Sequence, residues 1–410
     1  MRLTSEERGM LAGAEGPAVK KAMQIVTALA EIYAAECLVP VASVQIAGVS
    51  FKNLGDAGLE FLQEWAAQGA RVRVPSFLNP AGMDMARWQE MRVAPSFAEK
   101  QIELVRTLES MGAEPTCTCT PYLVGHAPQL GQHLAWSESS AVSYANSVVG
   151  ALTNREGGPS ALAAAIVGRT AAYGLHLTEN RRPTHVIDVA ARLENEADYA
   201  ALGSFVGRTV GDGIPYFRLR SLSAAPTQEQ LMTLGAAMAA SGAVALYHVE
   251  GVTPEAATLA PAAALPIVAV PDLREAHAGL NSPVDAIDFV SVGCPHSTLR
   301  DIERIATLLD GHRVTATLWI TTSRYVRALA EQRGLVKRIE QAGGHVLADT
   351  CLIVAPVEEM GFTAMATNSG KAAFYAPAHS HLQRRLGSIE QCMAAAITGR
   401  WSEEQGQDGV

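Results

Sequence analysis

Residues 288–334, DFVSVGCPHSTLRDIERIATLLDGHRVTATLWITTSRYVRALAEQRG, decide the fold class. The stretch contains two short apolar runs, 288–293 and 313–321, and each is followed by a segment with helical spacing of its apolar residues, 297–311 and 322–334. Apolar runs that alternate with amphipathic helices are typical of parallel sheets covered by helices. The stretch therefore predicts two strand–helix units of an α/β protein.

The alternation of strand and helix patterns extends to both sides of this stretch. We predict helices over 55–70, where Asp56 caps the helix, and over 96–112. Further strands are predicted over 38–48, 71–74, 115–120, 184–190, 243–249, 266–270 and 345–350. The sequence therefore predicts an α/β fold in which several lobes of mostly parallel sheet are flanked by helices. We expect residues 1–410 to form one functional region, with a lobe boundary near 270–285.

The composition is that of a well-buried globular protein. Of the 410 residues, 48% are hydrophobic and 18% are charged, which is enough for a large core. The net charge of −9, without a run of lysine or arginine, predicts no binding to nucleic acid or to anionic lipid. The first ten residues, MRLTSEERGM, lack the apolar stretch of a signal peptide, and no segment has the length of a membrane span. We therefore expect a cytoplasmic protein.

Six cysteines are too few for a disulfide framework in a chain of this length, and we expect them to be reduced. Three of them follow predicted strands: Cys119, Cys294 and Cys351. Ligands of parallel α/β sheets bind at the carboxyl ends of the strands, so these thiols could converge on one zinc ion or one iron–sulfur cluster. On spacing alone, three unrelated core cysteines are an equally good interpretation.

Other cysteines and two histidines extend this hypothesis. His126 and His296 lie near the cysteines in sequence and are candidates for a further zinc ligand. Cys117 points to the same face of the predicted strand as Cys119, so it either lines the site or replaces Cys119 as a ligand. The last two cysteines lie in helical patterns and are predicted core residues: Cys37 and Cys392.

Polar segments that follow strands offer groups for an anionic substrate. The backbone amides of Gly48, Val49 and Ser50 form either an anion pocket or an ordinary turn. Ser139 and Ser140 lie ahead of a helix, where they either cap the helix or contact a substrate.

Two later segments carry similar alternatives. Asn79 and Pro80 follow a short strand and form a turn on the simplest interpretation. Lys371 comes directly after Ser369 and Gly370 at a predicted helix start, which favours binding of a carboxylate or phosphate. A solvated surface lysine is the commoner case.

Three more residues are weaker candidates. Arg155 and Glu156 either face the cleft or form an ion pair that braces their loop. His248 ends a predicted strand, and a buried histidine with satisfied hydrogen bonds is a simpler interpretation than a donor behind the site.

A series of segments, in order along the chain, resembles aconitase X, a divergent branch of the aconitase superfamily. The longest, WSESSAVSYANSVVGALTNREGGPSAL (136–162), is highly specific. The others are GVSFKNLGDAGLEFL (48–62), LNPAGMD (78–84), TCTPY (118–122), GRTAAYGLH (168–176), HVEGVTPEA (248–256), GCPHSTLRD (293–301), TTSRYV (321–326), DTC (349–351) and TNSGKAAFYAP (367–377). The resemblance therefore covers nearly the whole chain.

The resemblance implies an iron–sulfur dehydratase with an aconitase-like arrangement of layers. It implies Cys119, Cys294 and Cys351 as the cluster ligands and Cys117 as a neighbour. Three protein thiolates on a cubane leave one iron open, and that iron binds the leaving hydroxyl as a Lewis acid. The nuclearity of the cluster varies within the family and stays open.

The resemblance also implies a second, smaller swivelling domain, which is either fused to this region or carried by a separate small subunit. In the family, a serine of that domain serves as the catalytic base. This chain ends at Val410, soon after the stretch SIEQCMAAAITGRW (388–401). We therefore expect a small partner subunit and place no catalytic base on this chain.

The family acts on β-hydroxy acids, among them cis-3-hydroxy-L-proline and mevalonate 5-phosphate. Through the matching segments, the resemblance places these residues at the substrate: Gly48, Val49, Ser50, Asn79, Pro80, Ser139, Ser140, Ser369, Gly370 and Lys371. A phosphate calls for several cations, and the candidate segments offer few besides Lys371. We therefore predict cis-3-hydroxy-L-proline as the substrate and mevalonate 5-phosphate as the alternative. A cluster-bearing sensor or binding protein is the alternative of another class.

Overall fold

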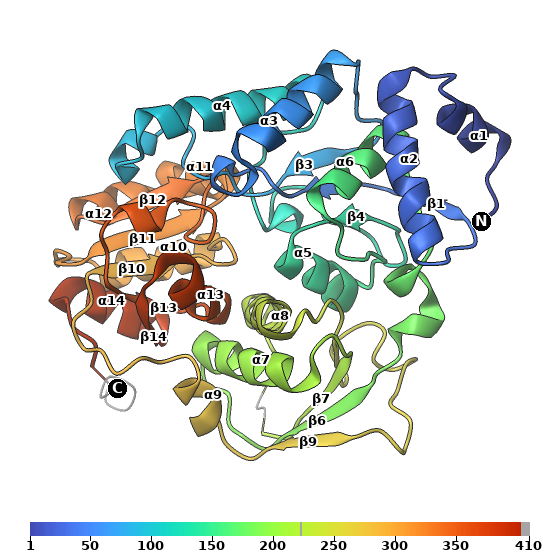
Figure 1. The fold of residues 1–410 in the computed structure, drawn as a ribbon. Helices are drawn as coiled ribbons and strands as arrows, with labels where there is room; N and C mark the ends of the chain where they lie inside the picture. The colour runs from blue at the N-terminus through green and yellow to red at the C-terminus, as the bar shows by residue number, and fades with distance from the viewer. Residues whose placement is uncertain (222–223, 403–410) are drawn as a thin grey trace.

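The computed structural model describes residues 1–221 and 224–402. Figure 1 shows three lobes around a central region, which we call the first (1–181), second (182–286) and third (287–402) lobes. One helix from each lobe lies at the centre, and α8 contacts the other two: α5 (Ser139–Tyr144), α8 (Gln228–Gly242) and α13 (Gly370–Ser380). The predicted boundary near 270–285 falls between the sheets of the second and third lobes.

The first lobe contains a three-stranded parallel sheet in the order β3-β2-β4. Its strands are β2 (Val44–Ile46), β3 (Ser76–Leu78) and β4 (Ala135–Trp136), and a separate antiparallel pair joins β1 (Leu38–Pro40) to β5 (Arg169–Ala171). The other helices are α1 (Ser5–Ala12), α2 (Pro17–Ile32), α3 (Phe51–Ala67), α4 (Pro95–Ser110) and α6 (Gly158–Val167). Because the sheet is parallel, the segments that follow its strands leave from one edge.

The second lobe contains a four-stranded parallel sheet in the order β8-β7-β6-β9. Its strands are β6 (His185–Val189), β7 (Pro215–Leu219), β8 (His248–Val249) and β9 (Ile267–Val270). The helices are α7 (Glu196–Val210), α8 and α9 (Arg274–Ala278). Glycines let α7 and α8 approach closely, because a Cβ at Gly242 would lie 1.9 Å from the Gly207 carbonyl oxygen.

The third lobe contains a five-stranded parallel sheet in the order β12-β11-β10-β13-β14. Its strands are β10 (Phe289–Val292), β11 (Thr317–Thr322), β12 (His345–Ala348), β13 (Ala364–Thr367) and β14 (Gln383–Leu386). The helices are α10 (Leu299–Leu308), α11 (Arg324–Gln332), α12 (Leu335–Gln341), α13 and α14 (Ile389–Thr398). The strand order reverses between β10 and β13, which is where doubly wound sheets open a crevice for ligands.

The core of the third lobe explains why its sequence decides the fold class. Val290 pairs with Leu318 and Val292 with Ile320 across the β10–β11 ladder, and all four side chains are buried. Strands covered by helices on both faces are apolar along their length rather than alternating. The predicted α/β fold of several lobes with mostly parallel sheets flanked by helices is confirmed.

Some predicted strands are wrong in their bounds. The run 38–48 is two strands of different sheets, β1 and β2, because the chain turns between them. Residues 71–74 form no strand, and the strand of this region, β3, begins at Ser76. The segment 115–120 is not a strand either: only Glu114 bridges to Phe77 of β3, and the backbone turns at Cys117, whose φ is 44°.

The helix predicted over 55–70 begins earlier, at Phe51, with Ser50 rather than Asp56 at its cap. Gly55 interrupts it with φ 63°, so the predicted start lies at an internal kink. The helix predicted over 96–112 begins at Pro95, a residue that favours the first turn. In the described part of the chain, no helix has both the length and the apolar character needed to cross a bilayer.

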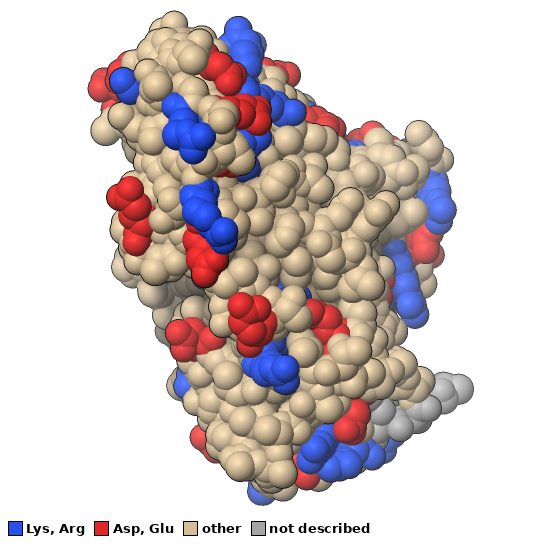
Figure 2. Space-filling view, turned by 90° about the vertical axis from the view of Figure 1, so that its right-hand side faces the viewer, with Lys and Arg blue, Asp and Glu red and all other residues tan. Residues whose placement is uncertain are grey.

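The face in Figure 2 carries interspersed acidic and basic side chains, some of them in the lower middle of the view, and a broad stretch above these is uncharged. Many charges of the molecule are paired on the surface, such as Arg220 with Asp188 and Arg274 with Asp272. Exposed pairs of this kind contribute little to stability.

Candidate active site

The three cysteines predicted as cluster ligands lie in one buried site. Cys294 follows β10, Cys351 follows β12, and Cys119 lies in the segment that runs beside β3. The Cys294 and Cys351 thiols interact directly, and Cys119 interacts electrostatically with both. None of the three side chains is more than 8% exposed. Segments far apart in sequence thus bring three thiols from the first and third lobes together.

His296 connects the three cysteine loops. Its backbone amide donates to Cys119 Sγ at 3.2 Å. Its ring donates from Nε2 to the Thr350 carbonyl and accepts at Nδ1 from the Thr118 hydroxyl, each at 2.9 Å, and these partners define the tautomer. Burial lowers the pKa of His296 to about 4. The neutral ring has no nitrogen left for a metal, unlike the zinc ligand considered from sequence.

The three thiols and their buried surroundings shift one another's pKa values. Contact with Cys351 raises the pKa of Cys294, and burial raises it further, while the same contact lowers the pKa of Cys351. Burial raises the pKa of Cys119, and the nearby Glu138 carboxylate adds to the effect. Because metal ions bind thiolates and displace protons, bound iron would offset the cost of ionising these buried thiols.

The arrangement does not suit a single metal ion. In residues 1–221 and 224–402, no group of three or more His, Cys, Asp and Glu side chains is placed to hold one ion. A structural zinc ion needs four ligands at one point. In an iron–sulfur cluster each cysteine binds a different iron, so its sulfurs need only surround a common cavity. This finding speaks against the single zinc ion drawn from spacing, and the cluster stays a prediction.

Beside the cysteines, Lys371 and Glu138 form a buried ion pair between the third and first lobes. Lys371 lies in the first turn of α13, and Glu138 is the N-cap of α5. The Lys371 ammonium also donates to Ser139 Oγ at 3.2 Å, and the Ser140 hydroxyl donates to Glu138 at 2.5 Å. The pair therefore holds the N-terminus of α13 against the N-terminus of α5.

Both members of this pair are charged. Burial opposes ionisation of Glu138, but Lys371, the Ser140 hydroxyl and the Ala141 amide outweigh it and lower the pKa of Glu138 to about 2. Burial also opposes the charge on Lys371, yet Glu138 and the neighbouring Cys294 raise the pKa of Lys371. Lys371 is therefore a charged residue with an internal partner, not the solvated surface lysine of the commoner case.

The turn 48–50 leaves backbone amides free. The N–H groups of Gly48, Val49 and Ser50 donate no hydrogen bond to another described residue. Gln101 shapes the turn by donating to the Val49 carbonyl at 2.7 Å. The Ser50 hydroxyl is occupied, since it donates to the Val354 carbonyl at 2.7 Å. Three adjacent free amides are what an anion pocket needs.

Several buried side-chain oxygens at the site have no hydrogen-bond partner among the described residues. They are Asn79 Oδ1, Tyr122 Oη, Ser137 Oγ, Ser297 Oγ, Thr350 Oγ1 and Asn368 Oδ1. Each directly follows a strand of the two sheets or lies within three residues of one of the three cysteines. Buried polar groups are normally paired, so this set indicates a space that water or a ligand fills.

The remaining predicted substrate residues have structural roles as well. Ser369 is the N-cap of α13, accepting from the Ala372 amide and donating to the Cys294 carbonyl. Gly370 packs against α7, where a Cβ would lie 2.8 Å from the Ala200 carbonyl oxygen. Pro80 is buried beside Asn79. These residues hold the loops of the site in place.

Cys117 is placed differently from the prediction. Because the backbone turns at this residue, its side chain does not share a face with Cys119. Cys117 is fully buried in the core of the first lobe, and the charged groups that act on it are Asp349, Arg324 and Glu109. It is therefore not the neighbouring ligand that the spacing suggested.

The other weaker candidates lie outside the site. His126 stacks on Phe77 and contacts Glu114. His248 is buried and its Nε2 donates to the Arg181 carbonyl at 2.9 Å, but its Nδ1 has no hydrogen-bond partner among the described residues, so the predicted satisfied histidine is only half satisfied. Glu156 is buried with the Ser160 and Thr170 hydroxyls rather than in an ion pair, and Arg155 is exposed. Cys392 is buried, and Cys37 is only half-buried.

Sequence reasoning missed three residues of the site. Gln45 lies within β2 and joins Thr118 to Glu138, through bonds of 3.3 and 3.2 Å. A polar residue inside an apolar strand was the signal in the sequence that could have identified Gln45. Tyr122 stacks on Tyr144 with ring centroids 3.9 Å apart, and no spacing in the sequence indicates that contact. Asn368 follows β13 at the switch point, where a polar residue is a candidate on position alone.

Gly293 directly precedes Cys294, and its backbone passes close to the backbone of Thr321. Its φ is 106°, and a Cβ there would lie 2.1 Å from the Thr321 carbonyl oxygen. We expect Gly293→Ala to lower the free energy of unfolding by about 3 kcal/mol, measured by urea denaturation. Gly311→Ala is the matched control, because Gly311 has φ 73° with open space around it, and should cost about 1 kcal/mol. Equal losses in the two variants would contradict the close approach.

Comparison with known proteins places the chain among dehydratases. It matches family models described as the aconitase X first, second and third domains, over residues 1–179, 183–273 and 287–398. The phosphomevalonate dehydratase large subunit of Methanocaldococcus jannaschii is 44% identical over 96% of this chain and 99% of that protein. The cis-3-hydroxy-L-proline dehydratase of Pseudomonas aeruginosa is 35% identical over 97% of this chain and 70% of that protein.

The solved structures agree with this placement. A crystal structure of Thermococcus kodakaraensis aconitase X in its holo-form matches with a TM-score of 0.89 and 45% sequence identity, covering 97% of this chain and 100% of that one. The family models together cover most of the chain, and the curated relatives are dehydratases by name. The chain belongs to the aconitase X family of hydro-lyases.

Proposed function

We propose that this chain is the large subunit of an iron–sulfur hydro-lyase that dehydrates mevalonate 5-phosphate. One observation carries the proposal: three buried thiols and a buried Lys371–Glu138 pair share one site. The chain that holds this site matches a phosphomevalonate dehydratase large subunit over 99% of that relative's length. The higher identity to that relative than to the hydroxyproline dehydratase reverses the substrate preference drawn from sequence. Cis-3-hydroxy-L-proline becomes the alternative.

The donor set fits an iron–sulfur cluster. Cys119, Cys294 and Cys351 are free, buried and mutually interacting, and an unpartnered polar oxygen lies within three residues of each of them in sequence. These three residues would hold the cluster. When bound, a cluster with one iron lacking a protein ligand would act as a Lewis acid toward the leaving hydroxyl. The nuclearity of the cluster is left open in this proposal.

The chain's own groups would bind and orient the substrate. The free amides of Gly48, Val49 and Ser50 precede helix α3, and backbone amides at a helix start bind phosphate or carboxylate without a cationic side chain. This removes the objection that the site offers few cations. Asn79 and Lys371 would orient the other polar end, since the Asn79 side chain is unpartnered and Lys371 is charged.

The proton beside the substrate carboxylate would leave to a base on a small partner subunit. The relatives named large subunits support such a partner, which would carry the swivelling domain. The free cysteines suit a reducing compartment, so the cytoplasmic location stays our expectation.

Anaerobic co-expression with the small subunit tests the proposal. The purified complex should contain iron and dehydrate mevalonate 5-phosphate, with kcat/KM at least about 100-fold above that for cis-3-hydroxy-L-proline, because a site that binds a phosphate strongly rejects a substrate without it. Product formation is followed by mass spectrometry. The large subunit alone is the control and should be inactive. Dehydration of cis-3-hydroxy-L-proline only would overturn the substrate, and iron binding without turnover of either compound would favour the sensor.

A further inference from the structure

We infer that Arg181 is a positioning residue for the active site, acting through the helix that carries Glu138. The inference rests on the proposed function, in which the Lys371–Glu138 pair belongs to the site. Arg181 itself lies at the end of the first lobe and touches none of the three cysteines. Its side chain is fully buried.

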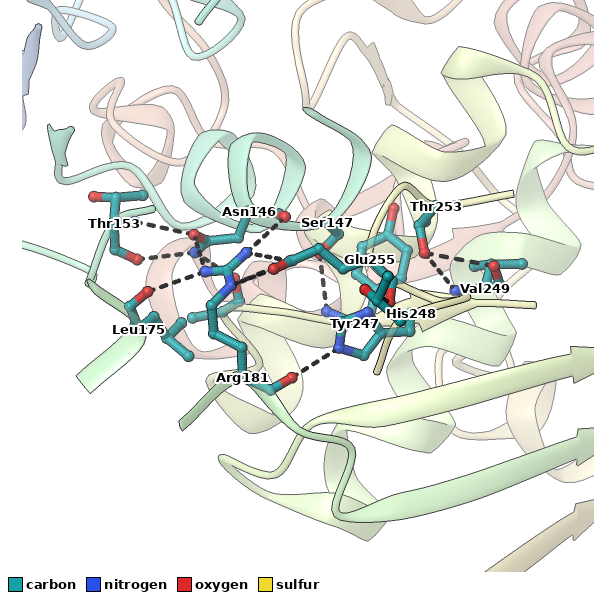
Figure 3. Close-up of polar contacts among 12 residues, drawn as sticks. Asn146, Ser147, Thr153, Leu175, Arg181, Tyr247, His248, Val249, Thr253 and Glu255 are labelled. Atoms are coloured by element: carbon teal, nitrogen blue, oxygen red, sulfur yellow. Dashed lines mark hydrogen bonds and ion pairs between the residues drawn. The ribbon is translucent and has the colours of Figure 1, made fainter. Parts of the chain in front are cut away.

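The guanidinium of Arg181 uses every donor it has. Nε and Nη2 bind the Glu255 carboxylate of the second lobe, at distances from 2.5 to 3.1 Å. Nη2 also donates to the Asn146 carbonyl, and Nη1 donates to Asn146 Oδ1 and to the Leu175 carbonyl, each at 3.1 Å. Figure 3 shows the guanidinium between these partners. No other side chain supplies five donors in one plane.

Asn146 is held in one orientation by this contact. Its Oδ1 accepts from Arg181 and from the Thr153 amide at 3.0 Å, while its Nδ2 donates to the carbonyls of Thr153 and Ala245, each at 2.9 Å. All the donors and acceptors of the side-chain amide are thus committed, and a flipped amide would set donors against donors. The bonds join the first lobe, at Thr153, to the second lobe, at Ala245.

Asn146 lies in a π-helical turn, Ala145–Val149, that continues helix α5 without a break. Such turns are rare and occur frequently at functional sites. At its other end, α5 begins at Glu138, whose carboxylate holds Lys371. Between the two ends, Tyr144 stacks on Tyr122, three residues after Cys119. A shift at Asn146 would therefore move Glu138 and the segment of Cys119.

Other residues of the second lobe also form hydrogen bonds to this turn and to Arg181. The Ser147 hydroxyl accepts from the Tyr247 amide at 2.9 Å, and His248 Nε2 donates to the Arg181 carbonyl at 2.9 Å. Tyr247 and His248 lie at the start of β8, so the strand and the arginine bind adjacent residues of the turn (Figure 3). The position of α5 is thereby fixed relative to two lobes, not one.

A buried ion pair is an inefficient way to gain stability, because apolar residues of similar size often replace it at no cost. The Arg181 side chain is fully buried, and that of Glu255 is 17% exposed. What apolar residues cannot supply is the directed bonds to Asn146. The pair is therefore explained by the orientation that it imposes on Asn146. A positioning role of this kind predicts a loss of activity, whereas a purely stabilising role does not.

The test compares the double variant Arg181→Met/Glu255→Met with Arg169→Met/Glu7→Met in the complex with the small subunit. Arg169 and Glu7 form a similarly buried pair, 16% and 5% exposed, within the first lobe and away from α5. We expect both double variants to fold with the iron content of the wild type, and the Arg181 variant to melt at a lower temperature because the Leu175 and Asn146 carbonyls lose their donor. The Arg181 variant alone should lose about 100-fold in kcat/KM for mevalonate 5-phosphate, as small misplacements of reacting groups do. Arg181→Lys, with three donors, should lie between.

Amide hydrogen exchange provides a readout that does not depend on turnover. Residues 139–149 should exchange faster in the Arg181→Met/Glu255→Met variant than in the wild type or the control variant. Full kcat/KM in this variant would overturn the inference and leave the pair a purely structural role. If the wild-type complex is inactive, the proposed function fails, and unchanged exchange over 139–149 would then overturn the positioning role as well.

Discussion

Replacing Cys294 with serine should abolish iron binding and dehydration together. A serine hydroxyl is a poor ligand for iron compared with a thiolate, and Cys294 is the thiol in direct contact with Cys351. We expect cluster iron and acid-labile sulfide to fall below about a tenth of the wild-type content, because outer partners alone cost 10–100-fold in metal affinity and a direct ligand costs more. Iron analysis and the visible absorption of the anaerobic complex measure this.

Cys117→Ser is the matched control for this prediction. Cys117 is as buried as Cys294 and lies two residues from Cys119, but it faces the core of the first lobe. The variant should keep full iron content and lose only stability. Full iron content in Cys294→Ser, or loss of iron in Cys117→Ser, would contradict the ligand assignment.

Lys371→Met should be the most destabilising single change at the site. It leaves the Glu138 carboxylate buried without its cation, which typically costs about 3–5 kcal/mol of the free energy of unfolding. Activity should fall by at least about 100-fold, as on removal of a group that stabilises developing charge. Denaturant unfolding and steady-state kinetics measure the two effects.

A double variant separates stability from activity. Lys371→Met/Glu138→Leu removes both charges, so most of the stability should return while activity stays low. Arg304→Met is the control, because the Arg304–Glu390 pair is more than a third exposed and should contribute about 0–1 kcal/mol. Full activity of the double variant would show that the pair serves folding only.

The sequence was most informative where local pattern and tertiary environment agree. In the third lobe, strands such as β10 are buried on both faces by helices. The apolar run 288–293 therefore matches β10 within one residue at each end, whereas the run 313–321 begins four residues before β11. Three of the cysteines could be placed together because strands of parallel sheets end at one edge. That argument held for Cys294 and Cys351 even though their partner Cys119 does not end a strand.

Contacts between segments distant in sequence could not be predicted. Nothing in the local pattern at Cys117 indicates that the backbone turns there with positive φ, which moves its side chain away from Cys119. The Lys371–Glu138 pair joins residues of different lobes. Lys371 had the local role of a surface lysine, and the helix cap was predicted at Ser139 or Ser140, whereas it is Glu138. The resemblance indicated that both segments matter, and the fold is needed to show that they meet.

The thiols of Cys119, Cys294 and Cys351 come from the first and third lobes, and the second lobe contributes none. A cluster bound by all three would be a covalent cross-link between the two ends of the chain, closing loops that include the whole second lobe. Closing a long loop restricts the unfolded chain more than closing a short one. Loss of the cofactor should therefore weaken the attachment of the first lobe to the third. Oxidative damage to the iron would then increase the motion of these two lobes relative to each other.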